Sequence, residues 1–165
     1  MQDNLSSESD IVPLPPIPGK LSPDLLQALH GGKAARRFPK GATLIQQASA
    51  ALGVYLVENG EVRVLLPTGQ NQKQLLEVLG PGTILGLSEN LTGETYRITA
   101  EAGDETAAVF VPRAEFLNFL REHCDFSMQV VRLLSEDLHG LYDKFRSISA
   151  HPGRPRHRAL DEQLN

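Results

Sequence analysis

Glycine spacing between residues 35 and 111 is the feature that most restricts the fold of this chain. The glycines stand at positions 41, 53, 60, 69, 80, 82, 86, 93 and 103. The segments between them are short and rich in branched or aromatic residues, which is typical of strands in a sandwich or barrel. We expect strands at 35–38, 43–46, 54–58, 61–66, 74–79, 83–85, 96–102 and 106–111. Eight such strands predict a mainly β fold, a double-stranded β-helix jelly roll.

One pair of turn residues stands out within this stretch. Asn59-Gly60 lies between two strand-like runs, at 54–58 and 61–66. A two-residue hairpin turn requires positive φ at both central positions, which asparagine and glycine tolerate best. The pair is therefore the strongest hairpin signal in the sequence.

Helices are expected on both sides of the strands. Ser22-Pro23-Asp24 has the features of a helix start, with an N-cap, proline at the first helical position and an early acid, and Gly31-Gly32 would end that helix. After Pro112 the apolar period changes from two to about 3.6. This change predicts a short helix at 113–122 and a longer helix, capped by Asp125, that reaches about Ile148.

The longer helix carries two apolar rows. One row alternates steps of three and four, which is the pattern of a two-stranded coiled coil, and predicts a homodimer interface made of Val131, Leu134, Leu138, Leu141, Phe145 and Ile148. The second row, Phe126, Val130 and Leu133, would pack on the barrel of the same chain. The alternative is that both rows form one wide stripe that lies entirely on one domain.

The two ends of the chain are expected to be disordered. Residues 1–20 are polar and acidic at first and then rich in proline, and residues 149–165 combine Pro, Gly and alternating charge. The folded domain is therefore expected at 21–148. The N-terminus lacks the charged and apolar regions of a secretory signal.

Composition excludes several classes of protein. Hydrophobic residues make up 41% of the chain and no apolar run approaches 18 residues, so we expect a core but no membrane span. The net charge of −4 gives no global sign of nucleic-acid binding. The single cysteine, Cys124, excludes an internal disulfide and a site with several thiolate ligands, and it favours a cytoplasmic protein.

Neither a metal site nor a catalytic site is expected. A cupin-type metal enzyme needs histidines that converge inside the barrel, and a Ser-His-Asp hydrolase needs a histidine base. All five histidines (30, 123, 139, 151 and 157) lie outside the expected strands. Cys124 is interpreted as a small buried hydrophobe. We therefore expect a protein that is not an enzyme.

Three segments in order resemble the cyclic-nucleotide-binding domain, and more closely the sensor half of the catabolite activator/FNR family of bacterial regulators. They are Phe38–Ile45, Val54–Val62 and Gly80–Gly86. The resemblance covers roughly residues 21–148 and implies a jelly roll, an N-terminal helix and a long dimerising helix. It also implies a phosphate cassette, in which a Gly-Glu pair and an Arg-Ser/Thr-Ala triplet hold the ribose and the cyclic phosphate.

The chain departs from the family pattern at three places, two in the cassette and one in the long helix. Leu87 stands at the Glu position after Gly86, and Tyr96 and Arg97 stand at the Arg and Ser/Thr positions of the triplet. A strand bulge could return Arg97 to the phosphate, because a one-residue slip reverses the faces of a strand. In the long helix, where the family reads adenine with a hydroxyl pair, Tyr142 supplies a single hydroxyl. The resemblance thus implies candidate ligand-binding residues at Gly86, Leu87, Ser88, Tyr96, Arg97 and Tyr142.

Three functional hypotheses follow. The first is a regulatory or sensor domain with an altered or degenerate pocket, which signals through a helical dimer. In this hypothesis no cofactor is certain, and a cyclic nucleotide stays a candidate ligand although the three departures argue against its usual binding mode. The second is a ligand-free module that binds a protein partner. The third is the sensor fragment of a transcription regulator, since the 17 residues after Ile148 are too few for the family's helix-turn-helix and no direct DNA binding is expected from this chain alone.

Overall fold

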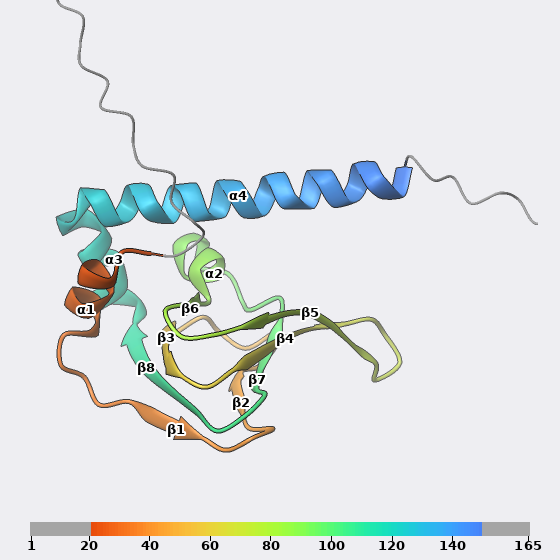
Figure 1. Cartoon of the computed structure of the whole chain (residues 1–165), viewed down its shortest axis with the longest axis horizontal. Helices are drawn as coiled ribbons and strands as arrows, with labels where there is room; N and C mark the ends of the chain where they lie inside the picture. The colour runs from red at the N-terminus through yellow and green to blue at the C-terminus, as the bar shows by residue number, and fades with distance from the viewer. Residues whose placement is uncertain (1–20, 150–165) are drawn as a thin grey trace, which may run out of the picture.

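The computed structural model describes residues 21–149 and confirms the jelly roll (Figure 1). Two antiparallel four-stranded sheets face each other, with strand orders β1-β8-β3-β6 and β2-β7-β4-β5. The strands are β1 (Arg36–Phe38), β2 (Thr43–Ile45), β3 (Gly53–Asn59), β4 (Val62–Pro67), β5 (Lys73–Leu79), β6 (Ile84–Leu85), β7 (Thr99–Ala102) and β8 (Thr106–Pro112). Most of these bounds lie within one residue of the expected ones.

Four helices accompany the sheets in the described part of the chain: α1 (Pro23–His30), α2 (Leu87–Thr92), α3 (Arg113–Glu122) and α4 (Cys124–Ser149). Ser22 is the N-cap of α1, Pro23 follows it, and Gly31 ends the helix in the left-handed conformation, as expected. In Figure 1, α4 runs across the top of the view above α2, and its C-terminal half points away from α1 and α3.

The prediction of a hairpin at Asn59-Gly60 is wrong, because the strands on either side of the turn do not pair with each other. The strand before it, β3, pairs with β6 and β8, whereas β4 pairs with β5 and β7 in the other sheet. The turn therefore carries the chain from one sheet to the other. Glycine is required at position 60 because its φ is 90° and an added Cβ would lie 2.4 Å from the carbonyl oxygen of Glu105.

The strand expected at 96–102 begins at Thr99. Tyr96 leaves the ladder because its backbone pairs with the loop before β3: its N–H donates to Ser49 O at 3.0 Å and its carbonyl accepts from Ala48 N at 2.8 Å. Its buried hydroxyl donates to Gly53 O at 2.6 Å. Gly53 was expected to separate two strands, but it is the first residue of β3.

Helix α4 begins at Cys124, so Asp125 lies in its first turn and is not the N-cap. The first helical hydrogen bond runs from Ser127 N to His123 O, and the His123 ring stacks on Phe119 at 3.9 Å between ring centroids. This ring stack lies at the joint between α3 and α4. Cys124 is exposed, which corrects its interpretation as a buried hydrophobe.

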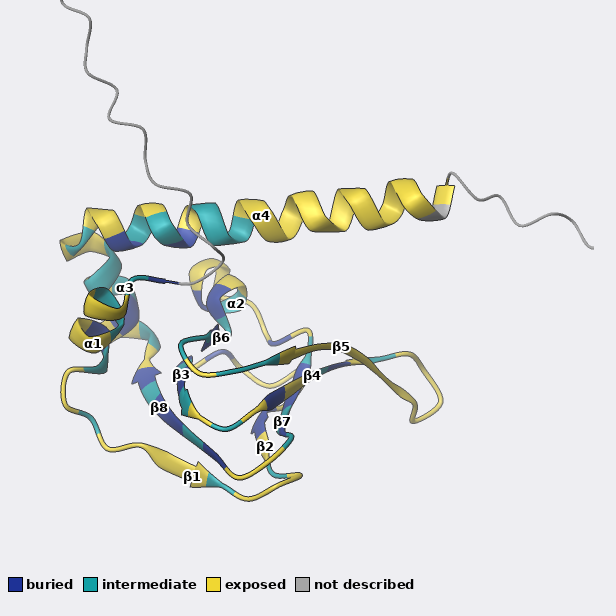
Figure 2. Ribbon diagram, in the orientation of Figure 1, coloured by how far each residue is buried: buried dark blue, intermediate teal, exposed yellow. Residues whose placement is uncertain are grey.

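The two rows of α4 have different surroundings (Figure 2). Phe126 and Val130 are buried in a core cluster that includes Phe116 of α3, and Leu133 packs against the same cluster. The second half of α4 is exposed, and the side chain of Ile148 is not among the described ones. Leu134, assigned to the dimer row, also packs against the chain's own core.

No helix in the range 21–149 combines the length and apolar character needed to cross a membrane. Both segments that the sequence predicts to be disordered lie outside the described residues, except that α4 continues through Ser149.

Candidate ligand pocket between the barrel and α4

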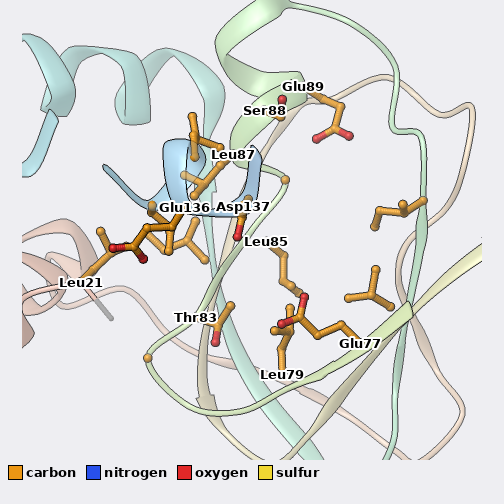
Figure 3. A pocket seen from close by; sticks show the side chains of 17 residues that line it. Leu21, Glu77, Leu79, Thr83, Leu85, Leu87, Ser88, Glu89, Glu136 and Asp137 are labelled. Atoms are coloured by element: carbon orange, nitrogen blue, oxygen red, sulfur yellow. The ribbon is translucent and has the colours of Figure 1, made fainter. Parts of the chain in front are cut away.

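A pocket of about 420 Å³ lies between the barrel, the short helix α2 and the long helix α4 (Figure 3). This size suits a small organic ligand. Its walls come from the segment before α1, from β4, β5 and β6 with the adjoining turn residues, from α2, from Ile98 and from α4. The lining residues are Leu21, Val64, Glu77, Leu79, Gly82, Thr83, Ile84, Leu85, Gly86, Leu87, Ser88, Glu89, Ile98, Leu133, Leu134, Glu136 and Asp137.

One side of the pocket is fixed by a buried asparagine of α2. Asn90 Nδ2 donates to Gly53 O and to Gly86 O, both at 2.8 Å, which ties α2 to β3. Arg113 Nε of α3 donates to the backbone carbonyl oxygen of Asn90 at 2.8 Å. Gly86 has φ 82°, and a Cβ there would lie 2.9 Å from the Tyr96 ring. The entry into α2 thus requires glycine at this position.

The opposite side is fixed by the packing of α4. Ser22 N donates to Gln129 Oε1 at 2.8 Å, which ties the segment before α1 to α4. Leu21, beside it, is buried and contributes to both the core and the pocket. Residues 133–137 of α4 therefore meet the pocket at a fixed place along the helix.

The charged groups on the pocket wall are all acidic. Glu77 comes from β5, Glu89 from α2, and Glu136 and Asp137 from α4, and no Lys, Arg or His is among the lining residues of the described chain. Figure 3 shows these carboxylates distributed over three different elements around the pocket. An anionic ligand would meet like charge from β5, α2 and α4 and would find no cation in the lining.

Asp137 shows the effect of this surrounding. Partial burial raises the pKa of its carboxyl above the ordinary value of 3.8, and the adjacent Glu136 raises it further. The folded chain therefore binds this proton more tightly than the unfolded chain. The protonated carboxyl therefore contributes to the free energy of unfolding at low pH, and this contribution is lost as the pH rises from 3.8 through the raised pKa. At neutral pH the charged carboxylate destabilises the folded chain relative to the unfolded chain.

Asp137→Asn is therefore expected to raise the melting temperature at pH 7. Asp137 is exposed, so solvent screening keeps the gain small, about 1–3 °C. The difference from wild type should narrow as the pH falls toward 3.8, and calorimetry over a pH series measures it. Asp143→Asn on the same helix, outside the pocket, serves as the control. A gain at pH 7 that persists unchanged at low pH would contradict the electrostatic origin.

The structure places three of the candidate ligand residues at the pocket. Gly86, Leu87 and Ser88 line it at the start of α2. Tyr96 is not in the lining, because its side chain is buried in the second core cluster of the barrel. Burial raises the pKa of the Tyr96 hydroxyl, so it stays protonated and donates to Gly53 O.

Arg97 and Tyr142 also lie outside the lining. Arg97 precedes β7 on a bend, and its exposed side chain pairs with Glu94 at 2.7 Å. The bulge that could return Arg97 to the pocket is absent from the β4–β7 ladder, which runs regularly from Thr99 to Ala102. Tyr142 is exposed on α4, five residues beyond Asp137.

Several lining residues were missed from the sequence. Glu77, Glu89, Ile98, Glu136 and Asp137 line the pocket but were not among the candidate residues from the sequence. The one sequence feature that pointed to them was the adjacent acid pair Glu136-Asp137, which lies between two apolar positions of the predicted dimer row.

The described residues hold no group of three or more His, Cys, Asp or Glu side chains arranged for a metal ion.

Comparisons with known proteins give related sequences and folds. Patatin-like phospholipase domain-containing protein 6 of Pongo abelii is 27% identical over 100 residues, which are 61% of this chain and 7% of that protein. Lysophospholipase nte1 of Aspergillus fumigatus is 27% identical over 104 residues, 63% of this chain and 7% of that protein. The chain thus spans about 7% of the length of these curated relatives.

Solved structures match over more of the chain and show the fold. The catabolite activator protein of Thermus thermophilus has a TM-score of 0.70 at 23% identity, with 78% of this chain and 61% of that chain covered. The sensor domain of the transcriptional regulator DNR from Pseudomonas aeruginosa has a TM-score of 0.61 at 24% identity, with 74% and 83% covered.

The sequence profile of the cyclic nucleotide-binding domain matches residues 35–123. This match runs from the residue before β1 to the residue after α3 and contains all eight strands of the jelly roll. It includes α2 and the β strands of the pocket wall, and it covers more than half of the chain. The protein therefore belongs to the cyclic nucleotide-binding domain family.

Proposed function

We propose that this chain is a non-enzymatic, cytoplasmic sensor domain that has an altered ligand pocket and signals through a dimer of α4. The single observation that carries the proposal is the double role of α4. Its residues 133–137 form a wall of the pocket, while an exposed apolar row continues along the same helix. A ligand in the pocket would therefore contact the element that forms the dimer.

The exposed row supports the dimer. Val131, Leu138, Leu141 and Phe145 are 54%, 46%, 61% and 70% exposed, and their spacing follows a heptad. Contiguous apolar surface of this kind marks an interaction site. Leu134 of the expected interface packs partly against the chain's own core, so the proposed contact is centred on the second half of the helix.

The pocket supports the altered ligand specificity. Leu87 offers no acceptor for a ribose hydroxyl, and Arg97 pairs with Glu94 and does not line the pocket. The lining residues include four carboxylates and no cation that could pair with a cyclic phosphate.

Calorimetric titration of the whole chain with cyclic AMP and cyclic GMP tests the altered pocket. We expect no binding at micromolar concentration, because the phosphate would be repelled by the carboxylates. Micromolar affinity for either nucleotide would contradict this part of the proposal. Sedimentation velocity tests the dimer separately.

Two further candidates have support of their own. A module that binds a protein partner is supported by Leu75, Leu76 and Val78, which are exposed on β5 at the edge of its sheet. Pull-down with variants at these three positions would test it. The sensor part of a transcription regulator is supported by the fold shared with the DNR sensor domain.

A further inference from the structure

The pocket has an apolar interior. Most of its lining side chains are Leu, Ile or Val, and they come from both the barrel and α4. A hydrocarbon body of a ligand could be buried against Leu79, Leu85 and Leu133 without leaving polar groups unpaired. The pocket is therefore suited to a ligand that is at least partly apolar.

The four pocket carboxylates have no ion-pair partner in the described part of the chain, whereas several acids elsewhere in the domain are paired. Glu58 pairs with His30, Glu94 with Arg97, Glu101 with Lys73 and Glu115 with Lys33. By contrast, no ion pair or side-chain hydrogen bond within residues 21–149 involves the carboxylates of Glu77, Glu89, Glu136 or Asp137. The negative charge that faces the cavity is thus uncompensated by the chain itself.

These carboxylates are spread over separate elements. Glu136 and Asp137 stand on α4, whereas Glu77 belongs to β5 (Figure 3). A positive group inside the cavity would be attracted from both walls, whereas an anion would be repelled by both. The arrangement therefore discriminates by charge sign and not only by shape.

We propose that the pocket binds an organic cation with an apolar body, such as a primary amine on a hydrocarbon chain, in place of a cyclic nucleotide. The inference rests on the proposed function, since it takes this pocket as the ligand site. A bound ammonium would be held by the carboxylates while its hydrocarbon is buried against the leucines. It would also offset the repulsion between Glu136 and Asp137.

Three probes with one hydrocarbon body and different charge test the proposal on the full chain. Hexylamine is a cation at neutral pH, hexan-1-ol is neutral and hexanoate is an anion. By calorimetry at low ionic strength we expect hexylamine to bind about tenfold more tightly than hexan-1-ol, and hexanoate to show no binding. Equal affinities, tighter hexanoate binding, or no hexylamine binding at millimolar concentration would each overturn the proposal.

A double variant, Glu136→Gln with Asp137→Asn, tests whether these carboxylates cause the preference. The ratio of hexylamine to hexan-1-ol affinity should fall to about twofold, while hexan-1-ol affinity stays unchanged and so reports an intact pocket. The matched control, Asp143→Asn, lies on the same helix outside the lining and should keep the full ratio. An unchanged ratio in the double variant would overturn the assignment. The binding of the three probes does not depend on dimerisation. A failure of this proposal is therefore distinguishable from a failure of the proposed function, which would appear as a monomer in sedimentation velocity.

Discussion

Replacing Leu138 and Phe145 together by glutamate is expected to convert the chain from a dimer into a folded monomer. Both side chains are exposed on α4 and lie seven residues apart, so each would face its counterpart in a parallel helix pair. Burial of such a side chain contributes about 1.5–3 kcal/mol, and the substitution also places like charges across the seam. Sedimentation velocity at micromolar concentration measures the change.

The control for this variant is His139→Glu with Arg146→Glu. Both positions are exposed on the same helix but outside the apolar row, and the change adds more negative charge than the test variant. The control should remain dimeric. If the wild-type chain itself sediments as a monomer, the dimer is wrong and the exposed row serves another purpose.

Phe126→Ala is expected to destabilise the chain by about 3–5 kcal/mol, the largest effect of a single substitution considered for this domain. Phe126 is fully buried and makes an edge-to-face contact with Phe119, with 5.1 Å between the ring centroids. Its removal opens a cavity where α4 is anchored on the barrel. Urea unfolding at one fixed chain concentration measures the loss, since association would otherwise change the apparent stability.

Leu52→Ala is the matched control for Phe126→Ala. Leu52 is 71% exposed, so its truncation removes little buried surface and should change the free energy of unfolding by less than about 0.5 kcal/mol. A loss for Phe126→Ala no larger than that of the control would contradict the anchoring of α4 through this residue.

Parts of the candidate site were accessible from the sequence because they depend on neighbouring residues. The segment from Gly86 to Ser88 was placed at the pocket, and Leu87 marked the departure from the family pattern. The acidic character of the pocket was not predicted. Its carboxylates are separated by up to 60 positions along the chain and are gathered only when α4 packs against the end of the barrel that holds β5 and α2.

Local chemistry was sufficient for the elements themselves. The sequence alone determined the short strands, the start of α1 at Ser22-Pro23 and the long amphipathic α4, because glycine placement, capping residues and apolar period act over a few neighbours. It also placed a turn at Gly60, whose φ is 90° in the structure. Only the tertiary structure decided that the turn at Gly60 connects two sheets, that Tyr96 turns into the core and that Leu134 is shared between the pocket and the core. A strand has two edges and a helix several faces, so which neighbour each one meets depends on residues far away in the chain.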